Sequence, residues 1–333
     1  MIKKEVEKIL QYVQKPARYV GGELNSVIKN KDEVDLRYAF CFPDTYEIGM
    51  SHLGMKILYG LVNEREDAWC ERVFAPDTDM EEQMRKNNVP LFALESGDYI
   101  KDFDIIGFTL QYELCYTNVL NMLDLAGIPI WSKDRTELAP IVCVGGPCAC
   151  NPEPIADFCD IIFLGDGEES TNQVLDLLKE CKKSGSTKQE FLLKAKDIQG
   201  VYVPSFYEVE YNDDETVKAV TPINNAPQKV KKAVVADMNK VYYPDKFVVP
   251  FIDIVHDRAV EEIFRGCIRG CRFCQAGFIY RPIREKSVEI INKQAMALIE
   301  STGYDEISLC SLSTSDHSRV NEMLTTLIDW TVK

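Results

Sequence analysis

The sequence predicts an α/β protein in which a doubly wound parallel sheet is followed by the first βα units of a second array. Short apolar runs of strand length alternate with longer segments whose apolar residues recur at helical spacing. Gly and Pro close most of these runs, as expected at turns. A chain of 333 residues has room for about two domains of roughly 100–200 residues each. This alternation is typical of a parallel sheet covered by helices.

Composition and charge exclude several classes of protein. The chain is 46% hydrophobic and 27% charged, with a net charge of -15, so its whole surface does not attract nucleic acid or anionic lipid. No apolar run approaches the roughly 18 residues of a membrane helix, and we therefore predict no membrane partner. The 12 cysteines are not spaced like a secreted disulfide scaffold. We expect a cytoplasmic protein.

Residues 1–35 are expected to form an N-terminal helix, over residues 3–14, and an extended lead-in. Residues 36–184 then form the doubly wound domain. Its first helix, over residues 51–63, places Leu53, Ile57 and Leu61 on one face. The expected strands are 36–42, 69–74, 91–93, 105–110, 141–144 and 161–164, and the further helices are 80–87, 113–126 and 168–184.

Residues 185–255 interrupt the alternation and predict a β-hairpin and an irregular connector, because prolines punctuate them. Residues 256–333 resume it. The expected strands of these two segments are 201–203, 207–211, 217–220, 260–264 and 306–309, and the expected helices are 287–301 and 316–332. Two βα units cannot close a barrel, which needs about 250 residues. We therefore expect a chain truncated at its C-terminal side; alternatively, the two units extend the first sheet.

The strongest motif is a run of three cysteines, Cys267, Cys271 and Cys274, spaced C-x₃-C-x₂-C. Three thiolates on one loop can hold three corners of a 4Fe–4S cluster and leave the fourth iron open. A zinc site would need a fourth ligand, and the candidates His256 and Cys310 lack the usual spacing. A redox pair would not need Cys267. The loop follows a strand, which is the catalytic position in an α/β barrel.

This run, with Phe273 before its last cysteine, resembles the radical S-adenosylmethionine (SAM) superfamily. The resemblance implies that SAM binds the open iron beside Phe273 and is reductively cleaved to a 5′-deoxyadenosyl radical. It also implies an electron donor of the flavodoxin or ferredoxin type. The superfamily's second motif, a Gly-Gly-Glu-like turn, is replaced here by Cys310-Ser311-Leu312-Ser313-Thr314. Ser311 and Ser313 are the SAM contacts expected there, and ordinary turn serines are the alternative.

The first domain resembles flavodoxin-like cobalamin-binding domains. The segment Asp44-Thr45-Tyr46-Glu47-Ile48-Gly49 matches their Asp-x-His-x-x-Gly turn, with Tyr46 in the place of His. His52 comes too late for that place and is expected to be an ordinary residue at a helix start. A glycine-rich βα loop by itself is usually only a tight turn. The cobalamin contacts that the resemblance implies are Asp44, Tyr46, Gly49, Thr109, Gly145, Gly146, Gly165, Gly167 and Glu168.

Over residues 15–333 the chain looks like the first half of an uncharacterised family of B12-binding radical SAM proteins. This implies a Rossmann-like cobalamin-binding domain at 36–184 and the N-terminal part of a TIM-type radical SAM barrel at 256–333. The implied function is radical modification, such as methyl transfer, of an unknown substrate. An RNA or another phosphate-bearing substrate would suit the arginines of the cysteine loop. The alternatives are a non-catalytic iron–sulfur or cobalamin sensor and a zinc-binding structural module.

Overall fold

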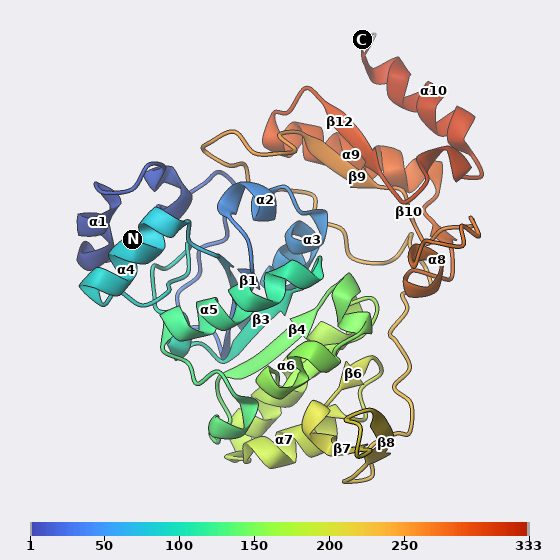
Figure 1. Cartoon of the computed structure of the whole chain (residues 1–333). Helices are drawn as coiled ribbons and strands as arrows, with labels where there is room; N and C mark the ends of the chain where they lie inside the picture. The colour runs from blue at the N-terminus through green and yellow to red at the C-terminus, as the bar shows by residue number, and fades with distance from the viewer. Residues whose placement is uncertain (1, 332–333) are drawn as a thin grey trace.

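A six-stranded sheet forms the centre of the computed structural model, which describes residues 2–331 (Figure 1). The strand order is β2-β1-β3-β4-β5-β6, with neighbours parallel except for β5 and β6. This order reverses direction between β1 and β3, as in doubly wound sheets. The strands are β1 (Leu36–Phe42), β2 (Ala68–Phe74), β3 (Ile105–Thr109), β4 (Ile141–Gly145), β5 (Ile161–Phe163) and β6 (Val201–Tyr202).

Helices cover both faces of the sheet, because successive side chains of its strands point to opposite sides. In β1, Ala39 and Cys41 face one core, whereas Tyr38 and Phe40 face the other. The first core is closed by α1 (Lys4–Leu10), α4 (Thr78–Asn87) and α5 (Tyr116–Ala126). The second core is closed by α3 (Leu53–Asn63), α6 (Glu168–Ser184) and α7 (Lys188–Ala195). The prediction of an α/β fold with a mainly parallel sheet is confirmed.

Several predicted elements differ from those found. Residues 91–93 do not form a strand of the sheet, because the amide of Leu91 bonds to Leu125 and that of Ala93 to Asp98. The first helix ends at Leu10, four residues earlier than predicted. Two elements lie in the segment predicted as hairpin and connector, namely α7 and the sheet strand β6. The sheet domain therefore extends past residue 184.

The predicted hairpin is present as β7 (Tyr207–Tyr211) and β8 (Val217–Pro222). Residues 223–258 contain no helix or strand and cross to the second βα unit (Figure 1). A short helix, α2 (Tyr46–Met50), precedes α3. Single 3₁₀ turns complete the chain at Pro16–Tyr19, Ile100–Asp102, Glu113–Cys115, Ser132–Asp134, Pro147–Cys150, Glu153–Phe158, Pro204–Phe206 and Thr314–Asp316.

The second unit is built on two parallel strands, β9 (Ala259–Glu262) and β12 (Ile307–Cys310), joined by α9 (Val288–Thr302). These strands pair only with each other within residues 2–331, so the alternative that they extend the first sheet is wrong. The last helix, α10 (Val320–Thr331), begins four residues later than predicted, and its predicted end at Val332 lies outside the described residues.

The cysteine run lies in a long loop between two short paired strands. These are β10 (Phe264–Arg265) and β11 (Arg284–Glu285), which are antiparallel, and the loop contains the short helix α8 (Ala276–Ile279). The single strand predicted over residues 260–264 is thus divided at Ile263. Among the described helices, none combines the length and the apolar character needed to cross a bilayer.

Candidate functional site

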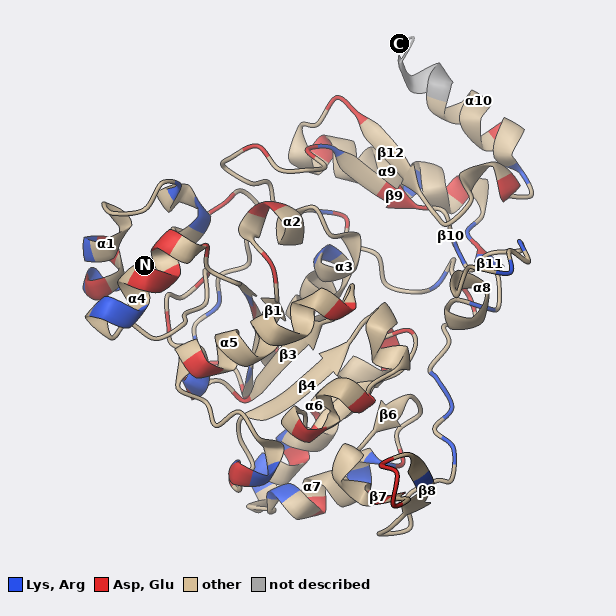
Figure 2. Ribbon diagram, viewed as in Figure 1, with Lys and Arg blue, Asp and Glu red and all other residues tan. Residues whose placement is uncertain are grey.

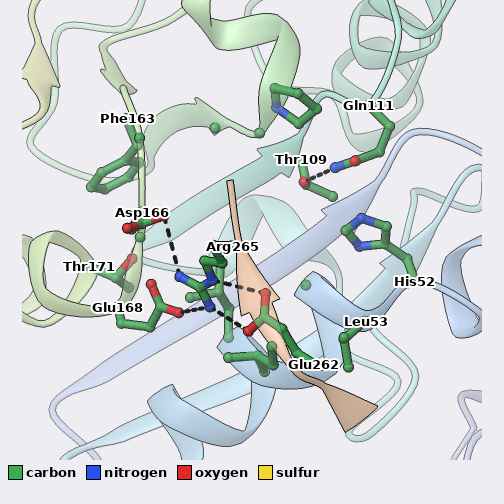
Figure 3. A pocket seen from close by; sticks show the side chains of 18 of the residues that line it. His52, Leu53, Thr109, Gln111, Phe163, Asp166, Glu168, Thr171, Glu262 and Arg265 are labelled. Carbon is green, nitrogen blue, oxygen red and sulfur yellow. Dashed lines mark hydrogen bonds and ion pairs between the residues drawn. The ribbon is translucent and has the colours of Figure 1, made fainter. Parts of the chain in front are cut away.

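A cavity of about 390 Å³ lies between the sheet and the second βα unit (Figure 3). One wall comes from the carboxyl ends of β1, β3, β4 and β5, and the opposite wall from β9, β10 and β12. Open parallel sheets bind ligands at this edge, close to the point where the strand order reverses. The fold therefore places a binding site between two segments that are distant in the sequence.

The sheet side of the cavity is largely aromatic. Tyr38 and Phe40 of β1, Phe108 of β3 and Phe163 of β5 line it. Leu53, at the start of α3, adds to the apolar wall. A mostly apolar pocket with a few polar groups is the usual form of a cofactor site.

A polar edge stands where β3 ends. The side-chain amide of Gln111 donates to the hydroxyl of Thr109 at 2.6 Å. His52 lies beside them and caps α3, because its Nδ1 accepts the amide of Met55 at 3.1 Å (Figure 3). Burial lowers the pKa of His52 to about 4, so the imidazole is neutral at pH 7. The predicted role of His52 at a helix start is thus correct, but its place in the cavity wall was missed.

Two glycine turns complete the sheet side, and each has a conformational reason. Gly146 has φ +97, and a Cβ there would lie 2.6 Å from the carbonyl oxygen of Leu110. Gly165 has φ +98, and a Cβ there would lie 2.1 Å from the carbonyl oxygen of Ala233. Gly145 and Gly167, the other glycines of these turns, also line the cavity. Thr109 and Glu168 line it as well.

A charged cluster connects the two walls through Arg265 (Figure 3). Its guanidinium lies 2.5 Å from Glu168, 2.9 Å from Glu262 and 3.3 Å from Asp166. Burial alone would lower the pKa of Arg265, but the attraction of Glu262 and Glu168 raises it above its ordinary value. Glu168, predicted as a cofactor contact, is therefore already engaged by an arginine of the second unit.

Three predicted cobalamin contacts do not line the cavity: Asp44, Tyr46 and Gly49. Tyr46 is buried, and its hydroxyl donates to Glu23 at 2.9 Å. A Cβ on Gly49 would lie 2.3 Å from the ring of Phe74. Asp44 accepts the amide of Thr45 at 2.7 Å and a bond from the hydroxyl of Tyr112. The structure gives these residues packing roles, and their contact with a cofactor stays a prediction.

The three loop cysteines lie at the protein surface. Cys267 is half-buried, Cys271 and Cys274 are exposed, and the side chain of Phe273 is 95% exposed. Among the described side chains, those of residues 2–327, no three His, Cys, Asp or Glu are gathered as a metal site requires. The donor set itself fits an iron–sulfur cluster with one open iron, since it supplies three thiolates from one loop.

The predicted SAM-contact turn follows β12. Ser311 lines the cavity together with Cys310. The hydroxyl of Ser313 instead donates to Asp316 at 2.6 Å, and Asp316 in turn pairs with Arg269. The structure therefore brings Ser311 to the cavity but not Ser313.

Positive charge collects around the cysteine loop of this acidic chain. Between Ile263 and Arg284 the sequence has five arginines and no acidic residue. Figure 2 shows this blue region beside β10, β11 and α8 and along the connector that approaches them. Arg272 and Arg281 are exposed. The loop thus has a positive local charge that would offset an anionic thiolate-bound cluster.

Comparison with known proteins agrees with this geometry. Residues 54–204 match the family described as radical SAM proteins, N-terminal. The chain is 27% identical over 294 residues to the uncharacterized protein MJ0966 of Methanocaldococcus jannaschii, covering 87% of this chain and 52% of that protein. It thus spans about half the length of this relative.

The fold is similar to that of TsrM from Kitasatospora setae, a radical S-adenosylmethionine methyltransferase. One TsrM structure, with cobalamin and a 4Fe–4S cluster bound, matches with a TM-score of 0.51 and 10% identity. A second, with tryptophan substrate and a SAM analog bound, matches with a TM-score of 0.53 and 11% identity. Each match covers 88% of this chain and 51% of TsrM. At this identity the likeness establishes the fold.

Proposed function

We propose that this chain, whose residues 54–204 match the family described as radical SAM proteins, N-terminal, forms the cofactor-binding part of a B12-type radical SAM enzyme. One observation carries the proposal. The cavity at the carboxyl edge of the sheet is closed by Arg265 and Gly266, and Cys267 is the next residue of the chain. The cysteine run, which would hold the cluster, therefore begins at the wall of the cavity in which cobalamin would bind.

In this proposal Cys267, Cys271 and Cys274 hold a 4Fe–4S cluster, and SAM occupies its open iron. The cluster, reduced by the external electron donor, would supply the one electron that cleaves SAM, and cobalamin would supply a carrier for a methyl group. Ser311 lies in the cavity wall facing the sheet and offers a hydroxyl to SAM. Phe273 is exposed on the cysteine loop and offers a ring face to SAM. An electron donor of the flavodoxin or ferredoxin type completes the proposed system.

The cavity suits the face of a flat cofactor such as cobalamin. Tyr38, Phe40 and Phe108 provide apolar contact, and Thr109 and Gln111 provide hydrogen bonds at one edge. The Nδ1 lone pair of His52 is occupied by the amide of Met55, so its proton lies on Nε2. His52 therefore offers a donor and no free lone pair, and the cobalt would have no imidazole ligand from this residue.

Methyl transfer is the reaction we propose, because the protein of similar fold is described as a methyltransferase. An RNA or another phosphate-bearing substrate would fit the exposed Arg272 and Arg281. Whatever the substrate, the sheet domain would bind the cobalamin and the cysteine loop would present the cluster to the same cavity.

The test is anaerobic reconstitution of the chain with iron and sulfide, followed by reduction in the presence of SAM. We expect about four irons and four sulfides per chain and release of 5′-deoxyadenosine. Cys271→Ala should lose most of the iron. Cys150→Ala, which removes another exposed thiol outside the run, should retain it. Tightly held zinc without sulfide, or equal iron in both variants, would contradict the proposal.

A further inference from the structure

The two ends of the cysteine loop meet at a narrow neck. Arg265 of β10 pairs across the strands with Arg284 of β11, and Phe264 pairs with Glu285. Residues 266–283, including all three cysteines of the run, lie between these ends. The direction in which the loop leaves the protein is therefore set at this neck.

A single carboxylate of the sheet domain contacts both ends of the neck. Asp166 stands in the turn between β5 and α6. It pairs with the guanidinium of Arg284, and it lies 3.3 Å from that of Arg265. The amide of Val235 donates to Asp166 at 2.7 Å. Two arginines that are 19 positions apart in sequence thus converge on one acidic side chain.

Asp166 is itself held rigidly. Its amide donates to the carbonyl of Ala233 at 3.0 Å, and Gly165 before it forms a parallel bridge with Ala233. The side chains of Asp166, Arg265 and Arg284 are 17%, 14% and 9% exposed. Charged groups in such a low-exposure cluster interact more strongly than surface pairs.

The other attachments of the loop do not involve carboxylates of the sheet domain. Lys232 donates to the carbonyl of Ile279 at 2.7 Å and to that of Arg281, so it holds the far part of the loop to the connector. Arg269 pairs with Asp316, which belongs to the second unit, and this arginine side chain is 59% exposed. The ion pairs that join the loop directly to the sheet domain are therefore those at the neck.

The same groups line the cavity. Asp166, Glu168, Glu262 and Arg265 all contribute to its wall. A ligand that fills the cavity consequently touches the side chains that hold the loop. Binding in the cavity and the position of the loop are then coupled, and the coupling is reciprocal.

We propose that Asp166 is a positioning residue that clamps both ends of the cysteine loop to the cavity wall. The direction in which the loop that carries the three thiols leaves the cavity wall depends on this carboxylate. The inference deepens the proposed function, on which it rests, because it concerns the loop that would hold the cluster. It assigns to Asp166 no contact with the reacting atoms.

The test is hydrogen exchange in the full chain without cofactors, followed over residues 263–286. Asp166→Asn keeps the shape and removes the charge. We expect exchange at the neck to accelerate at least about tenfold, including the amide of Lys286, which bonds to Ile263 at 3.0 Å. Amides of β1 and β3 should be unchanged. Asp166→Glu restores a carboxylate and should recover most of the protection.

Asp316→Asn is the matched control, because it removes an ion pair of the same loop without touching the neck. It should leave exchange at the neck as in the wild type. If Asp166→Asn accelerates exchange of the whole sheet, Arg284→Gln gives the same readout, since it removes one arm of the clamp. Neck exchange within about twofold of the wild type in both variants would overturn the proposal.

This experiment separates the clamp from the proposed function. It needs neither iron nor cobalamin, so a chain that fails to take up a cluster would refute the function while leaving the exchange result valid. Conversely, a chain that loads its cluster but shows an unchanged neck in Asp166→Asn and Arg284→Gln would refute only the clamp.

Discussion

The imidazole of His52 shows how burial sets the role of a single side chain. It lies in the cavity wall, where burial lowers its pKa to about 4; a hydrogen bond with Gln111 acts in the opposite direction, and the nearby Lys56 contributes a smaller lowering. Its Nδ1 caps α3 through Met55. The residue is therefore neutral in the folded protein at pH values where the unfolded chain begins to take up a proton.

This difference predicts a pH dependence of stability. The unfolded His has a pKa of about 6.5, so between roughly pH 6.5 and 4 only the unfolded state gains the proton. The stabilisation is present above pH 6.5 and is lost as the pH falls toward 4, by roughly 2–3 kcal/mol. Asn at position 52 would cap the helix without titrating.

The measurement is urea unfolding of the wild type and His52→Asn at several pH values from 7 to 4. The free energy of unfolding of the wild type should fall by roughly 2–3 kcal/mol more than that of the variant. Parallel curves for the two proteins would show that folding leaves the pKa of His52 unchanged.

A buried ion pair includes Glu261 of β9 and lies outside the cavity. Lys286 and Glu261 form an ion pair at 2.9 Å, and both side chains are fully buried. The lysine also donates to Gln294 at 2.7 Å and lies 3.6 Å above the ring of Tyr243. Burial raises the pKa of Glu261, whose second oxygen has no hydrogen-bond partner among the described residues. Each charge of this pair thus depends on the other.

We predict that Lys286→Met destabilises the protein by about 3–5 kcal/mol, because it leaves Glu261 buried without its cation. The double variant Lys286→Met, Glu261→Leu removes both charges and should recover most of that loss. Denaturant unfolding near pH 7 measures both values. A double variant as unstable as the single one would mean that the pair itself, rather than an unpaired charge, controls stability.

At the scale of elements, most strands and the long helices could be predicted from the sequence, whereas the short helices α2, α7 and α8 could not. The bounds of β1 and α6 were found as predicted, because an unbroken apolar run and a long amphipathic pattern are strong signals. A strand was predicted at 201–203, but its pairing with β5 in the main sheet, as β6, could not be predicted because pairing depends on tertiary contacts. The helix α7 was missed although Thr187 and Glu190 form a capping box at its start.

Gly165, in the turn after β5, can be compared with Gly185, at the C-terminal end of α6. Gly165 and Gly185 both have positive φ, so alanine is strained at either position. At Gly165 the added Cβ would also meet the carbonyl oxygen of Ala233 at 2.1 Å, whereas at Gly185 nothing lies within 4 Å. Only alanine at position 165 therefore forces neighbouring backbone, that of Ala233, to move.

Gly185→Ala should therefore cost about 1 kcal/mol, and Gly165→Ala at least about 2 kcal/mol more. Thermal unfolding of the two variants measures the difference. Equal losses would show that the contact with Ala233 relaxes freely and that conformational strain alone accounts for the effect.

At the scale of the whole molecule, the cavity exists only because two halves of the chain meet. The resemblance to cobalamin-binding domains implied that the glycine turns at 145–146 and 165–167 belong to the site, and the structure places these turns in the cavity wall. It could not show that Asp44, Tyr46 and Gly49 pack away from the cavity. That depends on a tertiary partner, Glu23, which bonds to the hydroxyl of Tyr46.

Gly145 offers a direct test of cofactor binding in this cavity. A Cβ there would lie 3.5 Å from that of Phe163, an ordinary contact, so valine should fit the strand and fill the cavity. We expect Gly145→Val to weaken binding of hydroxocobalamin at least about tenfold, a loss of about 1.4 kcal/mol. The melting temperature of the free protein should change little.

Absorbance titration with hydroxocobalamin measures this affinity. Cys41→Val is the control, because it adds bulk on the opposite face of β1, within the other core. It should bind as the wild type does. Undiminished affinity in Gly145→Val would place cobalamin elsewhere, and absence of binding to the wild type would refute the proposed role of the cavity.

The assembly of one cavity from distant segments also has a consequence for biosynthesis. The sheet strands end at Tyr202, whereas the opposite wall is supplied by residues 262–312. A ribosome adds about 5–20 residues per second, so synthesis of that wall is complete roughly 5–20 s after synthesis of the sheet. During this interval the aromatic floor of Tyr38, Phe40 and Phe108 is open to solvent. A large cofactor can enter from the side at that stage, before the second unit closes over it.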